Sequence, residues 1–135
     1  QVLGDYDGKV RVVYRFFPLS IHKNAKISGQ GAYAAYKMGK FEEMKDLLYE
    51  NQPSWEGLND PRQTFIAYAK DLGLDTGKFE ALMESNEAKK AVDSGEKEAV
   101  GLGLNSTPTF FLGNKQILPS DESQFKKLID EELNK

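Results

Sequence analysis

Few residues in this chain have side chains that could act together as nucleophiles, metal ligands or general bases. Among the 135 residues there is no cysteine and only one histidine, His22. The lack of cysteine excludes disulfides, thiolate metal sites and any thiol chemistry performed by this chain alone. A single histidine excludes an all-histidine metal site and most histidine-assisted catalysis. We therefore predict no metal ion, no cofactor and no catalytic residue within this sequence.

The residues that could suggest a site have ordinary structural interpretations. His22 follows Pro18-Leu19-Ser20-Ile21, which is typical of a surface or helix-start position. No Gly-x-Ser-x-Gly motif is present to support a serine triad built on this histidine. Four aromatic residues could line a groove, although aromatic residues at helical spacing more often belong to a core; they are Tyr33, Tyr36, Tyr49 and Trp55.

The composition of the chain argues against two classes of binding partner, nucleic acids and membranes. The net charge is −3 and the isoelectric point is near 5.3, so the chain lacks the basic character of a nucleic-acid-binding protein. The longest apolar runs, Val12–Tyr14 and Phe110–Leu112, are far shorter than the roughly 20 residues that a membrane-spanning helix needs. We expect neither a nucleic acid nor a membrane as partner.

The secondary structure that must position any site begins with a predicted strand. Residues Lys9–Phe17 are rich in Val, Tyr and Phe and lie between Gly8 and Pro18, which is typical of a strand. Its nearly continuous apolar centre suggests burial on both faces, as in a mainly parallel sheet covered by helices.

A helical region occupies most of the next 85 residues. Periodic apolar residues predict helices over 24–38, 40–51, 60–72, 78–84 and 85–102, with a break at Gln52–Trp55. Asp60 and Gln63 have the spacing of a capping box around Pro61, and Ser85 is placed to cap the last of these helices.

The chain then returns to β structure. Thr107–Leu112 and Lys115–Leu118 are predicted strands, and Gly113-Asn114 between them is a typical hairpin turn. Asp121 and Gln124 predict the capped start of a final helix. Together, these elements predict one α/β domain over residues 1–135, with a helical insertion at about 24–102.

Several segments occur in the order and spacing of one known family. They are Lys9–Leu19, His22–Ala25, Gly39–Phe41, Leu48–Gln52, Trp55, Leu72–Asp75 with Lys78-Phe79, and Gly101–Gly113. In this arrangement the chain resembles the DsbA-like thiol–disulfide oxidoreductases. The resemblance implies a thioredoxin-like, DsbA-type sheet with inserted helices, and a bacterial and often extracytoplasmic protein.

The resemblance also implies what this sequence lacks. The first core strand and the helix bearing the family's Cys-x-x-Cys motif would precede Gln1, and Gln1–Tyr6 would be the end of that helix. Disulfide exchange needs a thiolate nucleophile, so the chain as given is predicted to be inactive in this chemistry. The resemblance further implies a cis peptide bond between Thr107 and Pro108, with these two residues docking an extended substrate peptide.

Three interpretations of function remain open. The chain is part of a DsbA-like oxidoreductase, or a naturally complete non-catalytic module that binds a peptide or partner, or a decayed gene product. In a thioredoxin fold the absent strand lies between Lys9–Phe17 and Thr109–Leu112. Without it both neighbours would expose unpaired edges. Another chain could donate a strand, the two neighbours could pair directly, or the missing segment itself could fill the gap. If the 135 residues are all there is, we expect a homo-oligomer formed by strand exchange or edge pairing. Extended polypeptide is the other expected partner.

Overall fold

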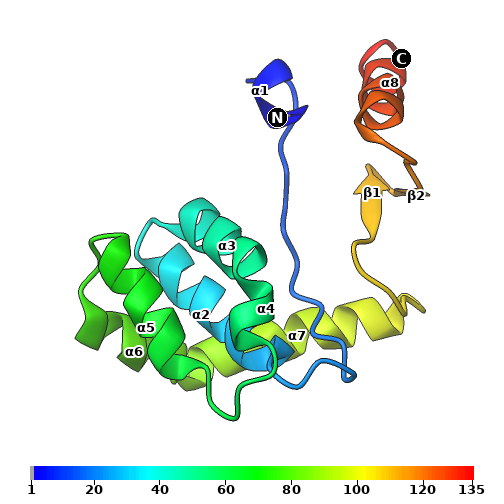
Figure 1. The fold of residues 1–135 in the computed structure, drawn as a ribbon. Helices are drawn as coiled ribbons and strands as arrows, with labels where there is room; N and C mark the ends of the chain where they lie inside the picture. The colour runs from blue at the N-terminus through cyan, green and yellow to red at the C-terminus, as the bar shows by residue number, and fades with distance from the viewer. Residues whose placement is uncertain (1) are drawn as a thin grey trace. The chain divides into compact units, whose positions relative to one another are not determined.

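A computed structural model describes residues 2–135 (Figure 1). The chain divides into two compact units: one contains the chain up to Tyr14 together with Ser106–Lys135, and the other is Arg15–Asn105. The first unit contains α1 (Val2–Asp5), β1 (Phe110–Leu112), β2 (Lys115–Ile117) and α8 (Glu122–Leu133). The second unit contains α2 (Ala25–Lys37), α3 (Phe41–Glu50), α4 (Gln52–Trp55), α5 (Arg62–Asp71), α6 (Thr76–Met83) and α7 (Asn86–Gly101).

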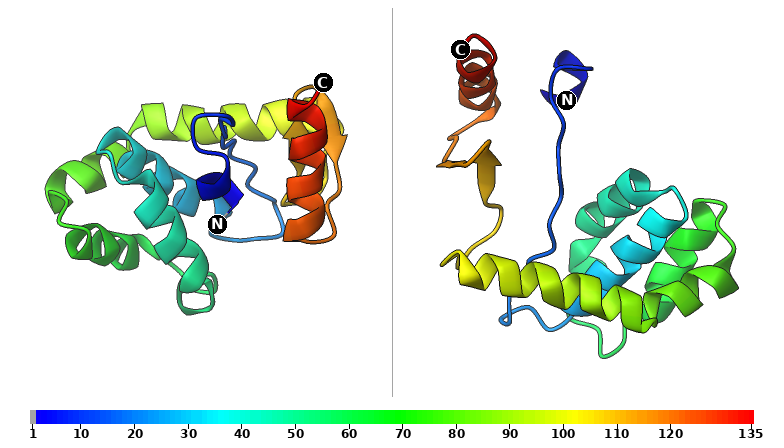
Figure 2. Two further views of the ribbon diagram at one scale, coloured as in Figure 1. Left: turned by 90° about the horizontal axis from the view of Figure 1, so that it is seen from above. Right: turned by 180° about the vertical axis from the view of Figure 1, so that it is seen from behind.

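The helical unit is built around α2, which packs against α3, α5, α6 and α7 (Figure 2). Its small residues Ala32, Ala34 and Ala35 are buried, so neighbouring helices approach it closely. Gly29 and Gly31 do not interrupt this helix. A Cβ on Gly31 would meet Phe65 and Met83 at 3.6 and 3.7 Å, respectively, so this position lies directly against the core.

The predicted helix starts are confirmed at Ser85 and Asp121. The Ser85 hydroxyl accepts a hydrogen bond from the backbone N–H of Ala88, and the Asp121 carboxylate accepts one from that of Gln124. These bonds satisfy donors that the first turn of a helix leaves unpaired.

The capping box predicted at Asp60 and Gln63 is wrong. Helix α5 begins at Arg62 with Pro61 at its N-cap, so Asp60 lies one residue before the cap position. Asp60 instead accepts a hydrogen bond from the backbone N–H of Arg62. The break predicted at Gln52–Trp55 is confirmed, because α3 ends at Glu50 before these residues. They form the separate one-turn helix α4, and Pro53 lies in its first turn, where the missing N–H is tolerated.

The prediction of a strand at Lys9–Phe17 is also wrong. Residues 10–18 have no assigned helix or strand, and the sheet of the described chain contains only β1 and β2. Strand-forming residues become a strand only when a neighbouring backbone supplies hydrogen bonds. Within residues 2–135 no such neighbour pairs with this segment. The expected mainly parallel sheet is correspondingly absent from the described residues, which are mostly helical.

The C-terminal hairpin is confirmed, with β1 starting later than predicted. β1 and β2 are antiparallel, with Phe110 opposite Ile117 and Leu112 opposite Lys115. Gly113 has a φ of 58°, a left-handed conformation that glycine adopts without steric cost. None of the helices in residues 2–135 combines the length and apolar character needed to cross a membrane.

Candidate functional site

The Thr107–Pro108 pair lies immediately before the hairpin. Both residues are exposed, and the peptide bond between them is cis, as the resemblance implied. The hydroxyl of Thr109 donates a 2.7 Å hydrogen bond to the carbonyl of Ser106, which closes a small turn around the pair. The turn leads directly into β1 at Phe110. Thr107 and Pro108 are therefore exposed just before the start of the strand.

β1 has one paired and one unpaired edge. Its hydrogen-bonded neighbour is β2, and no other strand of residues 2–135 joins the sheet. An unpaired strand edge presents backbone donors and acceptors to another extended chain. The geometry next to Thr107 is thus suited to the addition of a strand.

The two faces of the hairpin differ in whether α8 packs against them. Phe110 is 39% exposed but packs edge-on against Phe125 of α8, with ring centroids 5.2 Å apart, and Ile117 opposite it is buried. On the other face, Phe111 remains 46% exposed because successive side chains of a strand point in opposite directions. One face therefore belongs to the small core with α8, and the other remains open.

Tyr6 joins the N-terminal turn to α8. Its hydroxyl donates to the Asp130 carboxylate at 2.8 Å and lies 3.1 Å from the Lys126 carbonyl oxygen. Burial, followed by the hydrogen bond to Asp130, raises the pKa of Tyr6 above its ordinary value. The Lys126 ammonium lies 2.6 Å from Asp5 and lowers the pKa of that carboxyl. This cluster is fully paired within itself, so we assign it a structural role.

The other candidates from the sequence lie apart from this hairpin in the chain and do not form a catalytic cluster with one another. His22 is exposed before α2. Trp55 is buried and donates from its indole N–H to the Leu48 carbonyl, while Tyr36 and Tyr49 are 63% and 72% exposed. The tryptophan therefore belongs to the core. Within the described residues, no cluster of three or more histidine and acidic side chains is placed to hold a metal ion.

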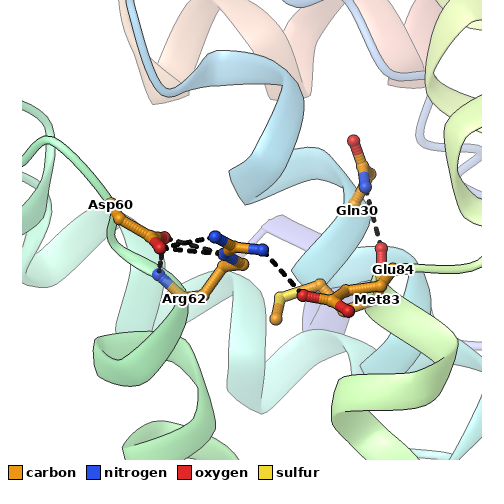
Figure 3. Close-up of polar contacts among 5 residues, drawn as sticks. All are labelled: Gln30, Asp60, Arg62, Met83 and Glu84. Carbon is orange, nitrogen blue, oxygen red and sulfur yellow. Dashed lines mark hydrogen bonds and ion pairs between the residues drawn. The ribbon is translucent and has the colours of Figure 1, made fainter.

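Sequence reasoning missed a polar network that joins α2, α5 and α6 (Figure 3). The Arg62 guanidinium contacts Asp60 and, at 2.9 Å, the Glu84 carboxylate. Hydrogen bonding from Arg62 lowers the pKa of Asp60 from 3.8 to about 2. The buried amide of Gln30 donates to the Met83 carbonyl at 2.8 Å. Gln30 sits among glycines and alanines of α2, and a polar residue within such a stripe was the signal for a buried hydrogen bond.

The chain matches part of several larger proteins. The Na(+)/H(+) antiporter NhaA of Herminiimonas arsenicoxydans is 30% identical over 115 residues, which are 85% of this chain and 17% of that protein. The Na(+)/H(+) antiporter NhaA 3 of Salinispora tropica is 29% identical over 117 residues, or 86% of this chain and 17% of that protein. This chain thus spans only 17% of the length of these relatives. No solved structure gives a significant match.

A family model supplies the assignment for nearly the whole sequence. Residues 1–131 match the model described as Thioredoxin, a region that includes the whole helical unit, all but the last four residues of the other unit, and the exposed Thr107–Pro108 turn. The described part of that region is mostly helical, with a two-stranded antiparallel sheet. The chain belongs to the Thioredoxin family.

Proposed function

We propose that this chain is the peptide-docking part of a DsbA-like thiol–disulfide oxidoreductase whose reactive cysteines lie outside residues 1–135. Membership of the Thioredoxin family supports the general class. The absence of cysteine from the sequence requires the second half of the proposal, because a thiolate must attack the substrate disulfide. In this proposal the chain binds and orients an extended substrate and contributes no reacting atom.

The exposed Thr107–Pro108 turn just before β1 is the observation that carries this proposal. Backbone groups of Thr107 make no hydrogen bond within the described chain, so they are available to an extended peptide. Pro108 has no N–H to offer, so the peptide would pair with the backbone of Thr107. Phe111, on the open face, would supply apolar contact.

The coding sequence upstream of Gln1 tests the proposal most directly. We expect a Cys-x-x-Cys motif upstream, at the start of the helix that continues into α1, with an apolar strand before it. A protein extended to include that motif should turn over a disulfide-linked peptide. In the extended protein, Thr107→Pro removes the docking N–H and should raise KM more than it lowers kcat. Thr76→Pro at the first position of α6 is a matched control, because proline is tolerated there.

The relatives favour a second candidate function. The matched proteins are named as Na(+)/H(+) antiporters, and their match to this chain covers 17% of their length. A non-catalytic thioredoxin-like module that binds a peptide or partner as part of a larger transport protein would fit this pattern. Upstream sequence without cysteines, together with peptide binding and no disulfide turnover, would favour this module over the oxidoreductase.

A further inference from the structure

The turn that precedes β1 is held by a side chain and not by the backbone. Within residues 2–135, Ser106, Thr107 and Pro108 make no backbone–backbone hydrogen bond. The half-buried Thr109 donates a 2.7 Å hydrogen bond from its hydroxyl to the Ser106 carbonyl. No other hydrogen bond to these three residues is made within the described chain. The direction of the Ser106 carbonyl therefore depends on Thr109.

The Ser106 carbonyl and the Thr107 N–H belong to the same peptide group. A peptide group is planar, and in its trans form the C=O and the N–H point in opposite directions. The bond between Ser106 and Thr107 is trans, whereas the next bond, to Pro108, is cis. A hydroxyl that holds the carbonyl on one side of this group thus also fixes the direction of the N–H on the other side. Thr107 is exposed, and its N–H has no partner in the described chain.

We propose that Thr109 is a positioning residue for peptide docking. Its hydroxyl acts through the Ser106 carbonyl and directs the Thr107 N–H toward a carbonyl of the extended peptide. The inference rests on the proposed function, in which Thr107 docks that peptide, and it adds a residue that does not touch the peptide. A hydrogen bond accepted by the Ser106 carbonyl also polarises the peptide group, so the Thr107 N–H becomes a better donor.

Two substitutions at Thr109, made in the extended protein, separate the hydroxyl from the shape of the side chain. Thr109→Val keeps the shape and loses the hydroxyl, so we expect KM for the disulfide-linked peptide to rise about fivefold with a smaller change in kcat. Thr109→Ser keeps the hydroxyl and should retain a KM near that of the wild type. Thr64→Val is the matched control, because the half-buried Thr64 of α5 makes no side-chain hydrogen bond within the described chain.

A second background distinguishes positioning from general support of the turn. Thr107→Pro already lacks the N–H that Thr109 directs. In this background Thr109→Val should raise KM no further, because the two residues act on the same hydrogen bond. A purely structural role of Thr109 would instead add its effect to that of Thr107→Pro, and this result would overturn the inference.

Nitrogen relaxation of the Thr107 amide tests the inference without a substrate. Thr109→Val should lower the order parameter of this amide, and Thr109→Ser should leave it as in the wild type. Equal order parameters in the three proteins would overturn the inference, as would equal KM values for the valine and serine variants. An extended wild-type protein that turns over no disulfide would contradict the proposed function instead, and the order parameters would still decide whether Thr109 directs this amide.

Discussion

Asn24 shows how one buried amide organises a loop of the helical unit. It is 5% exposed just before α2, and its side-chain nitrogen lies 3.1, 3.0 and 2.9 Å from the carbonyls of Trp55, Glu56 and Leu58, respectively. The amide thereby satisfies carbonyls at and beyond the end of α4 that helix bonding leaves unpaired. The sequence alone indicates only that Asn24 lies at the start of a helix. The structure shows that its side chain hydrogen-bonds to a segment more than 30 residues away.

Replacement of Asn24 by Asp should destabilise the protein near neutral pH. Asn24→Asp keeps the shape but places a carboxylate against three carbonyl oxygens, so we expect a loss of about 2–4 kcal/mol. Burial and these oxygens raise the pKa of the new carboxyl in the folded state. The deficit is therefore largest above that raised pKa and shrinks as the pH falls and the acid form donates a hydrogen bond.

Urea unfolding of both proteins between pH 3 and 7 measures this loss. Asn59→Asp is the matched control, because the exposed Asn59 oxygen accepts a hydrogen bond from Lys23 and a carboxylate can do the same. An Asn24→Asp protein as stable as the control at pH 7 would contradict the role assigned to this amide.

At the scale of elements, α7 accommodates the segment before α2 through one glycine. A Cβ built on Gly95 would overlap the carbonyl oxygen of Phe16 and lie 3.0 Å from its carbonyl carbon. The contacted atoms belong to the backbone, so rotation of a side chain cannot relieve the overlap. Gly95 is therefore required by the close approach of two chain segments, although glycine is unfavourable in the interior of a helix.

Gly95→Ala should thus destabilise the protein despite improving helix propensity. Overpacking of this kind costs about 1–3 kcal/mol, which exceeds the gain of about 1 kcal/mol from replacing glycine with alanine in a helix. Gly101→Ala, at the end of the same helix with open space around it, should be neutral or stabilising. Thermal unfolding of both variants compares them, and equal midpoints would refute the close approach at Gly95.

The Asp60–Arg62–Glu84 network joins the start of α5 to the end of α6, and it should respond to acid. The pKa of Asp60 is lowered to about 2 in the folded protein from an ordinary value of 3.8. A lowered carboxyl pKa stabilises the fold above the unfolded-state value, and this contribution is lost as the pH falls from about 4 to 2.

Asp60→Asn removes this contribution. We expect wild type to be more stable than the variant at pH 5, with the difference shrinking toward pH 2. Urea unfolding at low ionic strength is the appropriate measurement, since salt weakens exposed charge pairs. A difference that stays constant over this range would show that Asp60 does not gain stability from its ionised form.

At the scale of the whole molecule, the chain combines a thioredoxin-family assignment with a complete lack of thiols. We expect the pure 135-residue chain to have no disulfide oxidase, reductase or isomerase activity, because no side chain in it can replace a thiolate in this exchange. Release of a fluorescent thiol from a disulfide-linked peptide measures the activity. Turnover above the rate without protein would overturn this expectation.

The sequence by itself determined the local elements of this protein. Caps at Ser85 and Asp121 and the turn at Gly113-Asn114 are short-range features, and each is found where the sequence predicts it. The absence of thiol chemistry from residues 1–135 follows equally from composition. The caps and the turn depend only on residues close together in the chain. The lack of thiol chemistry depends only on the absence of cysteine from the sequence.

Only the tertiary structure decided features that depend on distant partners. Lys9–Phe17 has strand-forming residues, yet within residues 2–135 it has no strand neighbour and remains unassigned, since pairing is a property of two segments. The hydrogen bonds made by Asn24 and Gln30 likewise join residues more than 30 positions apart. So does the close approach of Gly95 to the backbone of Phe16. Such contacts arise from packing of the helices, which the period of one helix cannot specify.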